Sequence, residues 1–266
     1  MRALLVTALV AVAMPLAAQA APDLARERAD FTSWLATDPL SPYAAIAVQP
    51  VGPGITLGPD STDVVLGGID KVRIVEERAG LVLISGNARR VLPRGRPVAL
   101  GSYRLVADGE AGRRVVVVYG AVKDAHPPAY YPPGNSRVTV ELAAPSRKGA
   151  FRTLGLDGVE TMAEEVGIAS VPLGNTVTQL RVYRMGATDD DEAELMIFFR
   201  DATSNKGTYP AGRFVALDPA GGRKYTIDFN RARNPFCAYN TVFPCPAPWP
   251  GNTLPLAIEA GERYGK

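Results

Sequence analysis

Alternating apolar and polar positions, interrupted by short turn sequences, dominate the chain from residue 72 onward. Val72–Glu77 and Leu81–Ser85 flank Arg78-Ala79-Gly80, a pattern typical of a β-hairpin. Asp218-Pro-Ala-Gly-Gly222 indicates a second hairpin turn. Similar runs predict strands at 91–92, 98–105, 114–119, 136–142, 176–185, 194–200, 212–217, 223–229 and 253–260.

Two of these runs are apolar at every position rather than alternating. Val115–Val118 and Leu195–Phe199 therefore predict central strands that are covered on both faces. Phe151–Ile168 fits either a short helix or a bent strand, and we prefer the strand. The spacing of strands and turns favours an all-β architecture over repeated strand–helix–strand units.

One short helix is expected ahead of the strands. Asp23–Leu35 opens on a residue that can cap a helix and places Leu24, Phe31, Trp34 and Leu35 at near-helical spacing. Prolines and glycines then divide the chain into short pieces up to about residue 54. We expect the helix to pack its apolar side on the β-structure.

The first twenty residues have the pattern of a secretory signal peptide. Arg2 precedes an apolar run, and Ala18-Gln19-Ala20 matches the small-x-small cleavage site. A membrane anchor is the competing interpretation, but the run is short and Pro15 interrupts it. We expect cleavage after Ala20, no stable membrane anchor afterwards, and a periplasmic or secreted protein of 246 residues (266 minus 20).

Composition excludes several kinds of partner. The full chain has 29 basic and 27 acidic residues. Removal of the leader takes away Arg2, so the positive and negative charges of the mature chain are nearly equal in number. This balance gives no reason to expect a nucleic acid or a membrane surface as partner. Local basic pairs such as Arg89-Arg90 and Arg113-Arg114 fit a solvated face, with an anion-binding edge as the alternative.

The usual residues of metal and hydrolytic sites are scarce. His126 is the single histidine and lies in a proline-rich loop, so we expect no metal site, no cofactor and an exposed side chain. Asp189-Asp-Asp-Glu192 lacks the ligand alternation and glycine of a calcium loop and fits a solvated turn. Cys237 and Cys245 predict a disulfide in an exported protein, with free buried thiols or a reactive thiol as alternatives.

Two stretches of the second half resemble a known family. FFRDATSNKGTYPAGRFVAL, residues 198–217, and YTIDFNRARNPFCAYNTVFPCPAPWPGNTLPLAIEAGE, residues 225–262, are similar to members of the domain of unknown function 1684 family. Pro210 and Arg233 depart from the family pattern, which usually has glycine and tyrosine there. The resemblance implies a C-terminal β-domain and does not imply an activity.

The first half carries a weaker resemblance. Gly58–Leu66, the hairpin, Ser85-Gly86-Asn87 and Leu100–Tyr103 are similar to a forkhead-associated β-sandwich. The arginine and histidine with which that family binds phosphothreonine are missing, since Pro59 follows Gly58. We therefore expect a leader at 1–20, a helical arm and linker at 21–42, an N-terminal sandwich at 43–122, and an antiparallel C-terminal β-domain at 123–266.

Eight polar residues at family-motif positions are the candidate ligand site: Asp201, Thr203, Tyr209, Arg213, Asp228, Asn230, Arg231 and Asn234. If 212–217 and 223–229 pair as a hairpin, Arg213 and Asp228 come close together across the two strands. Such a pair fits a buried structural network, because a buried charge is tolerated only when it is paired. It equally fits a clamp on a ligand carboxylate or phosphate.

Three kinds of function are consistent with these residues. The first is a non-catalytic protein that binds a small molecule or an envelope protein through the C-terminal domain, with Tyr209, Tyr239 and Trp249 as apolar walls. The second is a hydrolase that uses Asp201 or Asp228 as general base and Arg213 or Arg231 to stabilise an anion. The third is a purely structural envelope component. A carboxylate of raised pKa in a pocket would favour the enzyme.

Overall fold

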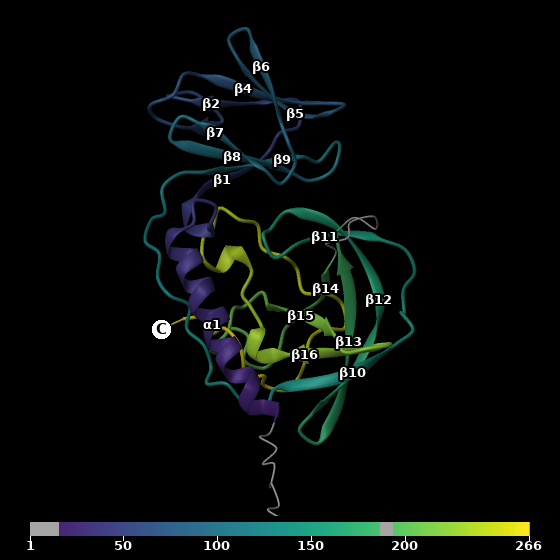
Figure 1. Cartoon of the computed structure of the whole chain (residues 1–266). Helices are drawn as coiled ribbons and strands as arrows, with labels where there is room; N and C mark the ends of the chain where they lie inside the picture. The colour runs from purple at the N-terminus through teal and green to yellow at the C-terminus, as the bar shows by residue number, and fades with distance from the viewer. Residues whose placement is uncertain (1–15, 187–193, 266) are drawn as a thin grey trace, which may run out of the picture.

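Two β-units and one helix make up the structure, a computed structural model that describes residues 16–186 and 194–265. The upper unit in Figure 1 holds strands β1–β9, and the lower unit holds β10–β16. Helix α1 lies along the lower unit and points its C-terminal end toward the upper one. The prediction of an all-β protein with a short N-terminal helix is confirmed. The tract 189–192 lies outside the described residues.

Helix α1 spans Leu16–Thr37 and is longer than the predicted 23–35. Its apolar side faces the protein as expected, because Leu24 and Leu35 are buried and Phe31 and Trp34 are half-buried. The first five residues of the helix, 16–20, precede the expected cleavage position after Ala20, and residues 1–15 of the predicted leader lie outside the described residues. Within the described part of the chain, no helix combines the length and apolar character needed to cross a bilayer.

The upper unit is a sandwich of two sheets, in agreement with the predicted architecture. One sheet has the strand order β1-β9-β8-β7 and the other β3-β2-β4-β5-β6. Leu57 and Ile74 of one sheet pack with Leu105, Val116 and Val118 of the other in a common core. Its strands are β1 (Ala45–Pro50), β2 (Ile55–Gly58), β3 (Val64–Val65), β4 (Val72–Glu77), β5 (Gly80–Ser85), β6 (Ala88–Leu92), β7 (Pro97–Leu100), β8 (Tyr103–Asp108) and β9 (Val115–Tyr119).

The prediction of one strand over 98–105 is wrong. Gly101 has a φ of +58°, in the left-handed region that glycine adopts without steric cost, and the chain reverses there. β7 and β8 are therefore two strands of a hairpin, paired from Leu100↔Tyr103 outward. The predicted β4–β5 hairpin is confirmed. β1 and β2 were not predicted, because prolines and glycines flank both of these short strands.

The lower unit is a sheet that closes on itself. Its order is β10-β16-β15-β14-β13-β12-β11, and β10 also pairs with β12. Its strands are β10 (Arg137–Ala143), β11 (Phe151–Leu154), β12 (Glu160–Leu173), β13 (Thr176–Met185), β14 (Glu194–Phe199), β15 (Arg213–Pro219) and β16 (Lys224–Asp228). The preferred strand interpretation of 151–168 is confirmed by β11 and β12, and β12 bends at a register shift between Glu165 and Gly167.

Both strands that were expected to be central are covered on two faces. β9 lies between β1 and β8, and β14 lies between β13 and β15. On β9, Val116 and Val118 belong to the core of the upper unit, while Val117 belongs to a separate apolar cluster. On β14, Ile197 and Phe199 point into the closed sheet, while Phe198 lies in a separate cluster under Trp249. The continuous apolar run of β14 follows from this double coverage.

The predicted strand at 253–260 is wrong. This segment crosses the lower unit without a regular ladder and makes one isolated bridge, Arg200↔Thr253. Leu254 N–H donates to the Arg200 carbonyl and the Leu256 carbonyl accepts from Ala202 N–H, but farther along Ile258 N–H donates to Asp201 Oδ2 at 2.8 Å. Side-chain bonds thus take over from backbone pairing before a regular strand can form.

Candidate functional site

Arg213 on β15 is the centre of a buried polar network. Its side chain is 1% exposed, and Nη2 donates to Asp201 Oδ2 at 3.0 Å and to the carbonyl of Ile258 at 2.9 Å. Nη1 donates to the carbonyls of Ala260 and Glu262. Burial lowers the pKa of Arg213, and the neighbouring charge of Asp201 raises it in part. The guanidinium thus fastens the C-terminal segment to the closed sheet.

Both carboxylate oxygens of Asp201 accept hydrogen bonds within the same network. Oδ1 accepts from Thr203 Oγ1 at 2.6 Å and from the Thr203 N–H at 3.1 Å. Thr203 Oγ1 in turn contacts Thr208 Oγ1 at 2.9 Å. Three of the eight predicted residues, Asp201, Thr203 and Arg213, therefore do come together, and their terminal polar atoms are used by protein partners.

The expected pairing of Arg213 with Asp228 is wrong. β15 and β16 pair from Pro219↔Tyr225 to Leu217↔Ile227, so Arg213 lies beyond the paired part of the hairpin. On its other side, Arg213 pairs in register with Phe199 of β14, which lies two residues before Asp201 in the chain. The register of the hairpin, which the sequence pattern did not specify, decides the partner.

Asp228 has a separate role at the end of β16. Its Oδ1 accepts from the Asn230 N–H at 3.0 Å and from Asn230 Nδ2 at 2.9 Å, which caps the short 3-10 helix Phe229–Arg231. Its Oδ2 lies 3.4 Å from Arg231 Nη1. Asn230 also binds the loop at Gly134, because its Nδ2 donates to the Gly134 carbonyl at 3.0 Å.

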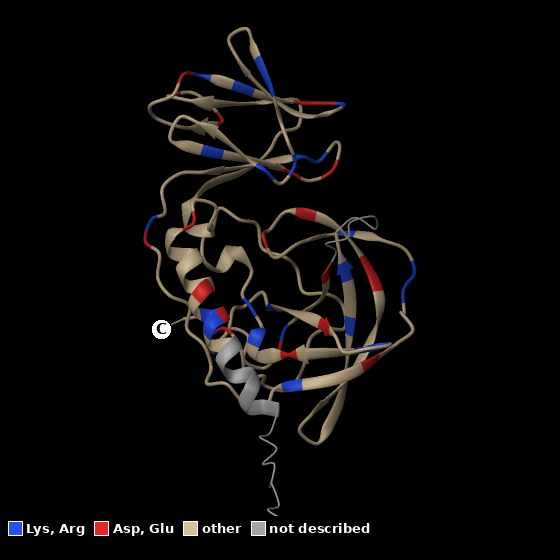
Figure 2. Cartoon of the chain, in the orientation of Figure 1, with Lys and Arg blue, Asp and Glu red and all other residues tan. Residues whose placement is uncertain are grey.

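Arg231 anchors helix α1. Nε donates to Glu27 Oε2 at 2.8 Å and Nη2 to Glu27 Oε1 at 2.9 Å, a bidentate pair that raises the pKa of Arg231. Beside it, Arg28 Nη2 donates to the carbonyl of Asn230 at 3.0 Å, and its guanidinium lies over the Tyr130 ring. Figure 2 shows charged residues of α1 beside this part of the lower unit. Glu27 and Arg28 were not predicted as part of any site.

A buried carboxyl, Glu262, lies next to the network. It is fully buried, accepts from the Asn234 N–H at 2.8 Å and from the Tyr239 hydroxyl, and leaves Oε1 without a partner among the described residues. Burial raises its pKa from 4.5 to about 7. Glu262 was not predicted as a site residue, although it is the glutamate of the Ala260-Gly261-Glu262 motif.

The predicted disulfide joins Cys237 and Cys245. The Tyr209 hydroxyl lies 3.3 Å from Cys237 Sγ and 3.2 Å from Cys245 Sγ. The disulfide closes a loop, residues 237–245, whose Phe243 packs with Val117 and Tyr119 of the upper unit. This loop therefore connects the two β-units.

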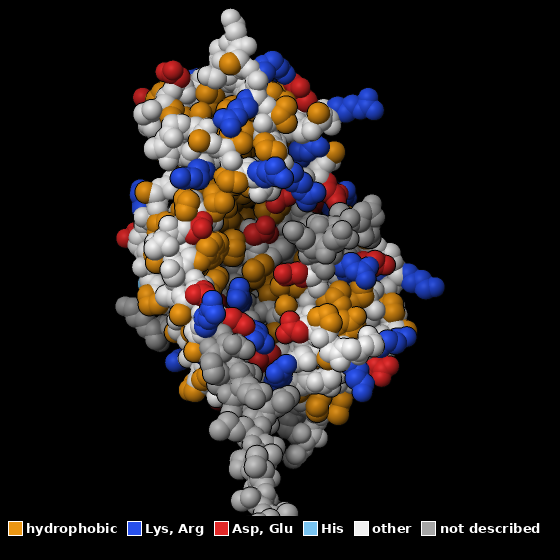
Figure 3. Space-filling view, viewed as in Figure 1, with side chains coloured by type: hydrophobic (Ala, Val, Ile, Leu, Met, Phe, Trp, Pro, Cys, Tyr) orange, Lys and Arg blue, Asp and Glu red, His pale blue; other side chains and the backbone are white. Residues whose placement is uncertain are grey.

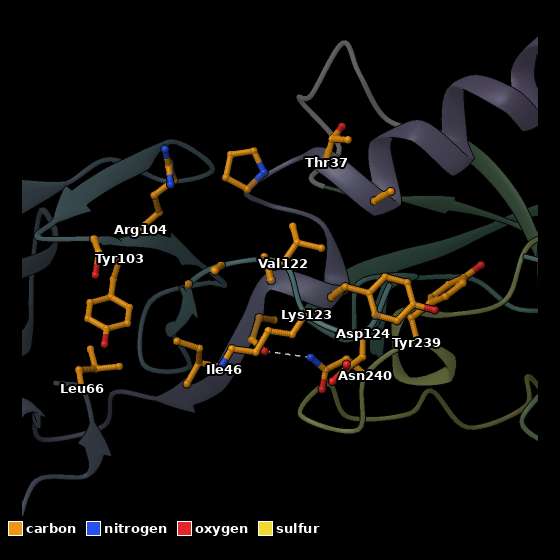
Figure 4. A pocket seen from close by; sticks show the side chains of 18 of the residues that line it. Thr37, Ile46, Leu66, Tyr103, Arg104, Val122, Lys123, Asp124, Tyr239 and Asn240 are labelled. Carbon is orange, nitrogen blue, oxygen red and sulfur yellow. Dashed lines mark hydrogen bonds between the residues drawn. The ribbon is translucent and has the colours of Figure 1, made fainter. Parts of the chain in front are cut away.

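A large cavity lies where the two β-units, the end of α1 and the disulfide loop meet (Figure 4). Its volume is about 1170 Å³, somewhat above the range of about 300–1,000 Å³ that is usual for ligand pockets. Its walls come from α1, β1, β8, the segment 120–126 that follows β9, and Tyr239 and Asn240 of the disulfide loop. Among the residues that the structure describes, none of the eight predicted ligand residues lines it.

The cavity wall combines apolar and polar groups. Ile46 and Val65 are exposed apolar side chains within it. The Tyr43 hydroxyl contacts the His126 ring at 3.1 Å, and Asn240 Nδ2 donates to the carbonyl of Ala45 at 2.9 Å, drawn dashed in Figure 4. His126 is exposed as predicted, but it also belongs to this wall. No cluster of histidine, cysteine and acidic residues suited to a metal occurs in residues 16–186 and 194–265.

A family model named Protein of unknown function (DUF1684) matches residues 127–263. The chain belongs to this family. The matched range contains the eight motif residues, the disulfide and Glu262, and it begins just after the upper unit. The recognition of the family from residues 198–262 is thereby confirmed.

A solution NMR structure of an uncharacterized protein of Haloarcula marismortui is 32% identical, with 53% of this chain and 77% of that chain covered and a TM-score of 0.44. No curated protein matches the chain.

Proposed function

We propose that this DUF1684 protein is a non-catalytic binding protein that holds a small molecule in the cavity between its two β-units. The observation that carries the proposal is the cavity itself, whose wall joins exposed apolar side chains to a few polar groups from separate segments. Concave sites of this composition are the usual form of a ligand pocket. The motif residues around Arg213 then serve the fold that supports the cavity.

The hydrolase alternative has less support. Asp201, Arg213 and Asp228 direct their terminal polar atoms at protein partners, and Arg231 binds Glu27. Among the described residues that line the cavity, Asp124 is the one carboxylate, and it is exposed. Glu262 has the raised pKa that an acid–base catalyst needs, but it is fully buried beneath Tyr239. Binding accounts for these features without a catalytic group.

We further propose that the protein acts in the periplasm or outside the cell. The leader-like residues 1–20 and the disulfide support export, because disulfides persist in oxidising compartments. The distribution of charge on the surface is also consistent with a protein that binds a small molecule. Charged side chains of both signs are scattered over the face in Figure 3, with no large area of one sign.

A thermal-shift screen of small metabolites tests the binding proposal. A ligand of the cavity raises the melting temperature of the wild type by mass action. Ala121→Trp fills the cavity from an exposed wall position, so it should abolish that shift. Val177→Trp, at an exposed position on β13 away from the cavity, is the matched control and should keep it. Shifts that are equal in wild type and Ala121→Trp, or no shift at all, would contradict the proposal.

A further inference from the structure

The charged groups of the cavity wall are predominantly basic. Arg104 on β8 and Lys123, four residues after β9, reach the cavity from different segments. Among residues 16–186 and 194–265, neither side chain has a carboxylate within ion-pair distance. Four other arginines near or in the upper unit do have one: Arg89 with Glu77, Arg94 with Asp108, Arg113 with Glu160, and Arg114 with Glu76. The cavity thus keeps two cations available.

One acidic side chain reduces this charge. Asp124 follows Lys123 in the chain and lines the same wall. Two cations and one anion leave a single positive charge. A ligand with one negative charge complements this wall, whereas a second negative charge would face Asp124 without a partner.

Apolar side chains form part of the exposed wall. Ile46 is 39% and Val65 63% exposed, two of the few large apolar side chains in the described residues that are so open. Figure 4 places Arg104 toward one end of the pocket and Tyr239 at the other, with Ile46 and Val122 between them. An apolar body lying along Ile46 and Val122 would remove this surface from water.

We propose that the ligand of this cavity is an anionic amphiphile, a molecule with one negatively charged head group and an alkyl or aromatic body. The head binds near Arg104 and Lys123, and the body covers Ile46, Val65 and Val122. This inference rests on the proposed function and names the ligand class for the same site.

Three probes with one chain and different heads test the inference: sodium decanoate and decyltrimethylammonium below their micelle concentrations, and 1-decanol below its solubility limit. Calorimetric titration of the full protein at low salt should give the highest affinity for decanoate. Arg104→Gln and Lys123→Gln should each weaken decanoate about fivefold, the range for one exposed charge pair, and leave decanol unchanged. Arg90→Gln, an exposed arginine of β6 away from the cavity, is the control.

The outcomes separate this inference from the proposed function. If decanol binds as tightly as decanoate, and Ala121→Trp blocks both, the anionic head is refuted while the cavity remains a binding site. If decanoate binds Ala121→Trp as well as wild type, its site is elsewhere and the inference fails. If no decyl probe and no metabolite binds in the cavity, both the inference and the proposed function fail.

Discussion

Arg213 illustrates how a conspicuous polar motif can serve the fold. Its guanidinium bonds Asp201 and the carbonyls of residues 258, 260 and 262, which hold no regular secondary structure of their own. These carbonyls would lie buried without a donor if the side chain were removed, and an unsatisfied buried polar group is costly. Arg213, whose residue type suggested anion binding, therefore fastens the C-terminal segment to the lower unit.

Replacing Arg213 tests this structural role. Arg213→Met should lower the free energy of unfolding by about 3–5 kcal/mol, because it leaves Asp201 as an uncompensated buried charge. Urea denaturation followed by circular dichroism measures the change. Arg184→Met removes an exposed ion pair on β13 and should stay within about 0.5 kcal/mol of the wild type. A loss below about 1 kcal/mol for Arg213→Met would contradict the structural role.

Glu262 should make stability depend on pH. Its pKa is raised from 4.5 to about 7 in the folded protein, so the folded state holds a proton that the unfolded state releases in that range. The free energy of unfolding is therefore expected to fall as pH rises from about 4.5 to about 7, by roughly 3 kcal/mol at 1.36 kcal/mol per pKa unit.

Glu262→Gln should remove this slope while its amide oxygen still accepts from Tyr239 and Asn234. Urea unfolding at pH 5, 6, 7 and 8 measures the effect. Asp157→Asn is the comparison, because the raised pKa of Asp157, from 3.8 to about 6, acts at lower pH. An unchanged slope between pH 6 and 7 in Glu262→Gln would show that Glu262 does not titrate there.

At the scale of single elements, α1 and the disulfide loop both join parts that are distant in the sequence. α1 binds the family-motif segment through Glu27–Arg231, and Arg233 lies over the ring of Phe31. The disulfide loop supplies Tyr239 and Asn240 to the cavity and Phe243 to the contact with the upper unit. Each element is short, but its side chains determine how the larger parts meet.

The disulfide should matter for both stability and binding. Replacing Cys237 and Cys245 together by serine should cost about 2–3 kcal/mol on the chain-entropy model, since the bridge closes a small loop. The added freedom of Tyr239 and Asn240 should also weaken decanoate in the cavity. Melting curves and calorimetric titration, with and without reductant, measure the two effects. The wild type should respond to reductant and the double serine variant should not; the same response in both would contradict this prediction.

At the scale of the whole molecule, a small apolar cluster joins two separate cores. The core of the upper unit and that of the closed sheet share no residues, while Ala44, Ala45, Val117, Tyr119, Cys237 and Phe243 pack together between them. Asn240 adds hydrogen bonds to the carbonyls of Pro42 and Ala45. The cavity lies beside this contact, so the relative placement of the units shapes the binding site.

Phe243→Ala should weaken the contact between the units. Truncation of a buried phenylalanine costs about 3–5 kcal/mol, and here the loss falls on the packing between two cores. Differential scanning calorimetry should then resolve two unfolding transitions where the wild type shows one. Val177→Ala, exposed on β13, should keep the wild-type profile. A single transition of unchanged width in Phe243→Ala would mean that the units are not coupled through this cluster.

The local sequence pattern by itself determined much of the secondary structure of this protein. The helix, the hairpin at 72–85, most strands and the disulfide follow from periodicity, turn residues and spacing, because each depends on neighbours in the chain. The strand predictions are wrong where contacts with distant residues outweigh the local preference of the chain for a strand. The segment 253–260 has a strand-like composition, but Arg213 and Asp201 bind its backbone and no strand forms.

The candidate site was decided by tertiary structure. The family motifs identified Asp201 and Arg213, but only the strand register made them partners and left Asp228 elsewhere. The cavity is formed by side chains as distant in sequence as Ile46, Arg104, Lys123 and Tyr239. No periodicity links such residues, since they meet only when two cores, a helix and a disulfide-closed loop pack together.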